Sequence, residues 1–184
     1  MGSLRNEKIE KKRHDSPVPV TKVLICLFPF LYFLHDLEEI IRIEPFLQEN
    51  AALLPVKLTK EEFAFAFTLL WIFASVGCIQ AFRGNRFLLM EPFTYLSFLI
   101  PGILLANGVA HLFQFLFLQA YLPGLITTII IIIPYSVYTI NVLIKKGLST
   151  YKQLLFYFLL GFILQAPLAF SALVISKWTF KWLF

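Results

Sequence analysis

The chain has 184 residues, of which 59% are hydrophobic and 15% charged, with a mean hydropathy of +0.77 and a formal net charge of +5. A soluble domain of this length cannot hide that much apolar surface from water, so the composition excludes a soluble globular protein and predicts an integral membrane protein. The positive charge suits loops that face anionic lipid headgroups, and it requires no nucleic-acid partner.

The chain begins with a polar, proline-containing segment, residues 1–21, which predicts a flexible basic tail. Residues 23–35 could also form the apolar part of a signal peptide, but no small-residue cleavage site follows them. The rest, 22–184, is predicted to be a single transmembrane domain. It holds five apolar stretches that are each long enough to cross a bilayer, which takes about 20 residues in a helix.

All five stretches are predicted to be helices, because lipid cannot satisfy the hydrogen-bonding groups of an exposed backbone. The fold class is therefore all-α, a polytopic transmembrane bundle of five helices. The predicted helices cover residues 22–42, 61–82, 92–119, 122–144 and 151–176.

The basic residues predict the orientation of this bundle. Of the 16 Lys and Arg residues, eleven fall on the side of the N-terminus and of the loops after the second and fourth helices. The other five fall on the opposite side, where the first loop is rich in acids. The positive-inside rule then places the N-terminus in the cytoplasm and the C-terminus outside. The eleven are Arg5, Lys8, Lys11, Lys12, Arg13, Lys22, Arg83, Arg86, Lys145, Lys146 and Lys152.

A few ionisable or amide side chains fall inside the predicted spans. Each costs a few kcal/mol near the membrane centre, so each is a candidate for function. In the first span, Glu38 and Glu39 follow His35 by three and four residues, which puts all three on one face of the helix. In the third span, Asn107 and His111 are also four residues apart.

These two polar faces are predicted to lie at a similar depth. With a rise of about 1.5 Å per residue, His35 lies about 20 Å above Lys22, whereas Asn107 and His111 lie about 22 Å and 28 Å above Pro92. Both spans start on the same side of the membrane. The two motifs are therefore expected to face each other in the outer half of the bilayer.

Two imidazoles and one carboxylate at one depth form the ligand set of a catalytic Zn²⁺ or a similar divalent ion. We predict that His35, Glu39 and His111 hold such a metal. Glu38 is then placed to activate water as a catalytic base, as a neighbouring glutamate does in metalloprotease helices. Asn107 is predicted to orient a ligand or to bind substrate.

Other readings of these residues remain open at this stage. The segment 35–41 can also be the end of the first helix, with its acids in water. His111 can be a hydrogen-bonded core residue. Asp36 points away from the shared face of the first helix. Gln165 in the fifth helix could reach the site, but packing is the preferred assignment.

The third predicted span is followed by the sequence YLPG, residues 121–124. Tyr121 suits the membrane interface, and Pro123 with Gly124 is typical of a tight turn into the next helix. This turn lies on the same side of the membrane as the polar cluster. It is therefore predicted to close the hairpin between the third and fourth helices as a supporting loop.

Together these three motifs resemble those of the HXXEE family of small bacterial membrane proteins. The motifs H-x-x-E-E, N-x-x-x-H and Y-x-P-G all match, in the order of the family, over about two thirds of the chain. The resemblance implies a multi-pass protein of a bacterial plasma membrane, in a family of unknown function with an enzymatic role suspected. The matching residues are His35, Glu38, Glu39, Asn107, His111, Tyr121, Pro123 and Gly124.

The first helix is also similar to that of the emopamil-binding sterol isomerases, five-helix membrane proteins whose H-x-x-x-E matches His35 and Glu39. A further acidic residue of those enzymes has no clear counterpart. The sequence thus favours a metal-dependent hydrolase whose partners are membrane lipid and a lipid-like substrate. It leaves open a metal-free acid–base isomerase of an isoprenoid or sterol, and a non-enzymatic transporter or proton relay.

Overall fold

The computed structural model of the chain describes residues 19–49 and 58–183, and within them it contains helices and no strand. Five of its helical stretches are long and apolar enough to cross a membrane, which confirms the predicted all-α architecture. Two stretches include π-helical turns, labelled η. The elements are α2 (Pro19–Glu49), α3 (Lys60–Phe82), α4 (Pro92–Phe98), η1 (Leu99–Leu105), α5 (Ala106–Leu118), α6 (Leu125–Thr127), η2 (Thr128–Ile132), α7 (Ile133–Lys145) and α8 (Tyr151–Leu183).

The first and last helices are longer than the sequence predicted. Helix α2 begins at Pro19 and not at residue 22. Proline fits the first turn of a helix, because backbone N–H groups there make no hydrogen bond within the helix and the one that proline lacks is not missed. Helix α2 also continues past residue 42 to Glu49, and α8 runs to Leu183. Residues 1–18 of the predicted tail lie outside the described residues.

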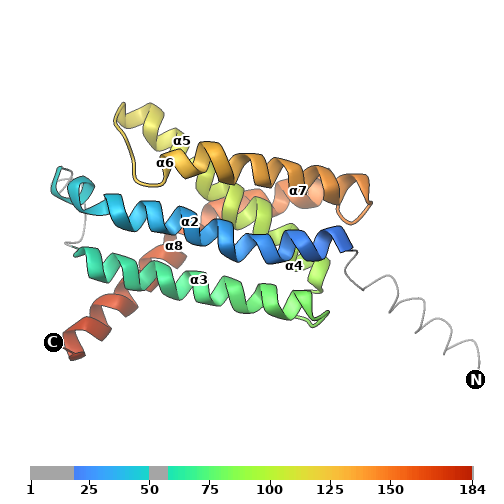
Figure 1. Cartoon of the computed structure of the whole chain (residues 1–184), viewed down its shortest axis with the longest axis horizontal. Helices are drawn as coiled ribbons and strands as arrows, with labels where there is room; N and C mark the ends of the chain where they lie inside the picture. The colour runs from blue at the N-terminus through green and yellow to red at the C-terminus, as the bar shows by residue number, and fades with distance from the viewer. Residues whose placement is uncertain (1–18, 50–57, 184) are drawn as a thin grey trace, which may run out of the picture.

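Consecutive spans run in alternate directions through the bundle (Figure 1). The loops at residues 83–91 and 146–150 lie at one end, and the loop at 119–124 lies at the other end. Helix α8 crosses the bundle obliquely behind α2 and α3, and it packs against α3 and η1. The start of α2 and the end of α8 therefore lie at opposite ends of the bundle.

The buried face of α2 joins the apolar core to the polar cluster. Its buried side chains include Ile25, Phe28, Tyr32, His35 and Glu39, which follow one another at intervals of three or four residues. This spacing keeps them on one helical face. The apolar half of that face holds α2 in the core, and so it fixes the direction in which His35 and Glu39 point.

Both π-helical turns occur next to a proline. Pro101 lies within η1, and Pro134 lies near the start of α7, directly after η2. A proline removes one backbone N–H and its ring clashes with the preceding turn, and a wider turn accommodates both effects. The prolines therefore account for the wide turns that adjoin α5 and α6.

Glycines allow α8 to approach η1 at backbone distance. A Cβ atom added to Gly161 would lie 1.7 Å from the backbone oxygen of Gly102, and one added to Gly102 would lie 2.7 Å from the backbone oxygen of Tyr157. No side chain fits between the two backbones. Small residues serve this purpose in membrane helix pairs, where van der Waals packing drives association.

Candidate metal centre

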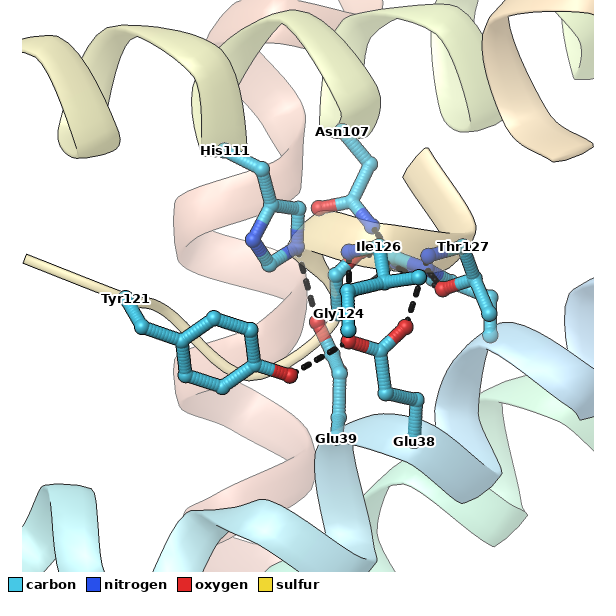
Figure 2. A network of polar contacts seen from close by, with 9 residues as sticks. Glu38, Glu39, Asn107, His111, Tyr121, Gly124, Ile126 and Thr127 are labelled. Atoms are coloured by element: carbon cyan, nitrogen blue, oxygen red, sulfur yellow. Dashed lines mark hydrogen bonds and ion pairs between the residues drawn. The ribbon is translucent and has the colours of Figure 1, made fainter. Parts of the chain in front are cut away.

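His35 and Glu39 of α2 converge with His111 of α5. Figure 2 shows Glu39 and His111 pointing toward each other from the two helices. His111 Nε2 lies 2.8 Å from Glu39 Oε1, and His35 Nε2 lies 3.5 Å from the same oxygen. One ligand atom from each residue falls within 4.8 Å of the others. The predicted meeting of the two polar faces is confirmed.

The cluster is almost entirely buried. His35 is fully buried, and only 5% of Glu39 and 9% of His111 remain exposed. The reading that places these groups in water at the end of the first helix is wrong for His35 and Glu39. Helix α2 continues to Glu49, so both residues lie well inside the helix and not at its end.

The tautomer of His35 follows from its neighbours. The Thr127 hydroxyl donates to the backbone oxygen of Gly124 at 3.2 Å, so its oxygen is left to accept the Nδ1–H of His35 at 2.8 Å. Nε2 of His35 is then unprotonated, and it accepts a hydrogen bond of 2.9 Å from the side-chain N–H of Asn107. In this tautomer the Nε2 lone pair can bind a metal once the hydrogen bond from Asn107 gives way to the ion.

Two further atoms of the cluster lack partners. Glu39 Oε2 and His111 Nδ1 are buried, and neither makes a hydrogen bond within the described part of the chain. Buried polar atoms without partners are uncommon and costly. Two histidines and one glutamate are a known donor set for Zn²⁺ with an open position, and this group could hold such an ion.

The side chain of Glu38 points to the segment that follows α5 and not to Glu39. Its carboxylate accepts hydrogen bonds from the Tyr121 hydroxyl at 2.6 Å, from Ile126 N at 3.2 Å and from Thr127 N at 2.7 Å (Figure 2). The two backbone N–H groups belong to the first turn of the fourth span, where they have no partner within the helix. Glu38 therefore caps that span from a neighbouring helix, and its predicted role as a catalytic base stays a prediction.

The YLPG segment forms the predicted tight turn, and it also builds the site. Gly124 has a φ of +86°, and a Cβ atom there would lie 2.9 Å from both His35 Cε1 and Glu39 Cγ. Only glycine combines that backbone conformation with that lack of space. Pro123 lines the cavity beside the cluster. The turn thus packs directly against two of the three candidate ligands.

Tyr121 lies between two spans and is partly exposed. Burial raises its pKa to about 12, and the hydrogen bond to the Glu38 carboxylate acts in the same direction, because an ionised phenol could not donate it. The phenol therefore remains protonated across the physiological range and keeps the loop joined to α2.

A cavity of 320 Å³ adjoins the cluster. Glu39, His111 and Asn107 line it together with Phe67 of α3 and Gln165 of α8. The side-chain oxygen of Gln165 is buried and makes no hydrogen bond within the described residues. From the sequence, packing was the preferred assignment for this residue, with contact to the site left open because it is an amide inside a span.

Two other residues show the limits of the sequence reading. Thr127 orients His35, but nothing in its sequence context marks it as part of a site. Asp36 is buried and its carboxylate has no partner among the described residues, yet it is not part of the group of three ligands. Its predicted direction, away from the shared face, agrees with this.

The fold and the site together define a class of helical proteins that have five apolar spans and a buried His/Glu cluster. The five spans are compatible with a multi-pass integral membrane protein. A family model described as "Protein of unknown function with HXXEE motif" matches residues 26–139, which include all three motifs. The chain belongs to this family, and the resemblance noted from the sequence is confirmed. No curated protein and no solved structure matches the chain.

Proposed function

We propose that the chain is an intramembrane metal-dependent hydrolase that acts on a lipid-like substrate. The observation that carries this proposal is the buried group of His35, Glu39 and His111, whose ligand atoms lie within 4.8 Å of one another. A divalent ion such as Zn²⁺ held by two imidazoles and a carboxylate keeps open positions, where it polarises a carbonyl and makes water a stronger nucleophile.

The proposed reaction is the hydrolysis of an ester. The oxygen of water bonds to the ester carbonyl carbon, the bond from that carbon to the alcohol oxygen breaks, and the proton of the water passes to the departing alcohol. Glu39 Oε2 is buried and has no partner among the described residues, which supports a role for it in carrying that proton. We propose that Asn107, which lines the cavity, binds the substrate. The hydrogen bonds of Glu38 support a positioning role for that residue.

We also propose that the N-terminus is cytoplasmic, that the C-terminus is outside, and that the site lies toward the extracytoplasmic face of a bacterial plasma membrane. The positive-inside rule supports this orientation. Arg83, Arg86, Lys145 and Lys146 lie in or beside the two loops at the end opposite the YLPG turn. A cysteine-accessibility assay on intact cells tests it.

The test of the metal site is the metal content of the purified protein by mass spectrometry. We expect one divalent ion per chain in the wild type, and loss of it in the double variant Glu39→Ala with His111→Ala. Asp36→Asn is the matched control, because it removes another buried carboxylate of α2 that has no partner within the described residues. No stoichiometric metal in the wild type, or metal retained in the double variant, overturns the proposal.

A second function is favoured by one contact. His111 Nε2 and Glu39 Oε1 are 2.8 Å apart, which is hydrogen-bonding distance. Such a pair can move protons on an isoprenoid or sterol substrate without a metal, as an isomerase does. Turnover that survives chelation but is abolished by Glu39→Gln would favour this function over hydrolysis.

A further inference from the structure

A second cavity, of 370 Å³, adjoins the cavity at the metal centre. We call it the chain chamber. Four residues line both cavities: Phe67, Asn107, Gln165 and Ala169. The remaining lining residues of the chain chamber are apolar or aromatic, and they come mainly from α3, α4, η1 and α8. The chain chamber is therefore an apolar space that continues from the site.

The volume of the chain chamber fits one alkyl chain. Its lining runs along one span from Asn107 back to Tyr95, through η1. At about 30 Å³ per group, close to the volume of a water molecule, 370 Å³ accommodates about twelve methylene groups.

The junction between the two cavities is polar. Asn107 donates a hydrogen bond to His35 Nε2, and so it links the junction to the metal centre. The Gln165 side-chain oxygen is buried there without a hydrogen bond among the described residues. A polar group of a ligand at this point would meet amide donors and acceptors from two helices, whereas the rest of its chain would meet only apolar side chains.

The chain chamber also borders the outside of the bundle between α3 and α8. Phe73 of α3 and Leu168 of α8 both line it, and they remain 53% and 44% exposed. In a bilayer these exposed side chains face lipid tails. An amphiphile can therefore reach the chain chamber sideways from the membrane.

We propose that the chain chamber binds the single acyl chain of a monoacyl ester, whose ester group lies between Asn107 and Gln165 beside the metal centre. The reaction at that ester rests on the proposed hydrolase function. The binding of the chain rests only on the cavity and on its polar junction. Gln165 is then a specificity-determining residue for the ester end of the ligand.

Photoaffinity labelling in detergent micelles tests this placement. The probe is a dodecanoylglycerol with a diazirine at the end of its chain. We expect the label on the far wall of the chain chamber, at Leu88 and Met90, and we expect unlabelled dodecanoylglycerol to compete for it. Labels spread over the exposed face of α8, or equal competition by a two-chain phospholipid, would show ordinary lipid contact and overturn the proposal.

Two variants of α8 sharpen the test. Ala169→Phe fills the junction, and we expect it to reduce labelling of Leu88 and Met90 at least tenfold. Val174→Phe adds the same side chain on the exposed face of that helix and should leave the labelling unchanged. Gln165→Leu should weaken labelling by dodecanoylglycerol about tenfold, and labelling by a diazirine alkane should stay the same. Full labelling of Ala169→Phe overturns the proposal.

The two proposals fail in distinguishable ways. Labelling that persists after chelation, in a protein without ester hydrolysis, supports the chain chamber and contradicts the hydrolase. Metal-dependent hydrolysis of a short-chain ester, without labelling of Leu88 and Met90, supports the hydrolase and contradicts the chain chamber.

Discussion

The substitution Gly124→Ala separates backbone strain from damage to the metal centre. An alanine at a φ of +86° costs about 1–2 kcal/mol in the left-handed region. Its Cβ would also lie 2.9 Å from His35 Cε1 and Glu39 Cγ, so those side chains must move by about 0.5 Å to regain ordinary contact. Overpacking of this kind adds about 1–3 kcal/mol, and displaced ligands reduce metal affinity about 10–100-fold.

Gly147→Ala is the matched control. Gly147 also lies in a loop between spans with a positive φ, +65°, but a Cβ atom there would meet nothing within 4 Å. It should therefore show only the backbone cost and retain full metal affinity. Thermal unfolding in detergent measures the stabilities, and calorimetric titration with Zn²⁺ measures the affinities. Equal Zn²⁺ affinity in Gly124→Ala and Gly147→Ala would refute the packing of Gly124 against the ligands.

Three other predictions follow from contacts of the site and of the bundle. Subtracting the ultraviolet titration of Tyr121→Phe from that of the wild type should give the titration of Tyr121, with a midpoint at about pH 12; a midpoint near 10 contradicts this. The contribution of Tyr121 to stability should fall between pH 10 and 12, because the folded state holds the phenol proton more tightly than the unfolded state does. Thr127→Val should lower Zn²⁺ affinity about 10–100-fold by releasing His35 Nδ1, whereas Thr127→Ser should preserve it. Gly161→Ala should lower the melting temperature by about 5–10 °C. Gly84→Ala should lower it less, because its Cβ would meet nothing within 4 Å and only the backbone cost of a φ of +79° remains. Equal losses would argue against backbone contact between the helices.

The candidate ligands could be predicted because, in a membrane helix, the position of a residue along the chain gives its depth in the bilayer. Lipid excludes every backbone conformation but the helix, so a residue number converts directly into a depth. Charged groups are rare in the spans, and the depths of His35 and His111 matched. These two facts identified His35, Glu39 and His111 without any knowledge of how the helices pack.

The contacts made by individual oxygen atoms could not be predicted in this way. Glu38 and Glu39 are adjacent, and both lie within one turn of His35, yet one caps a distant helix and the other joins the cluster. The two side chains leave α2 about 100° apart, so the rotation of this helix about its axis decides which of them faces the cluster. That rotation is set by the packing of the whole bundle, and the same holds for the position of Thr127.

The two π-helical turns lie directly beside the site. Asn107 follows η1 by two residues, and Thr127 immediately precedes η2. A π turn contains one residue more than the α-helical turn it replaces, so removing one residue restores regular winding and leaves the residues beyond it facing nearly the same direction. A single codon deleted inside η1 or η2 would therefore remove the wide turn while the functional side chain beside it stayed on the same face of the span. Such deletions offer a way to measure what the wide turns themselves contribute to the chemistry of this bundle.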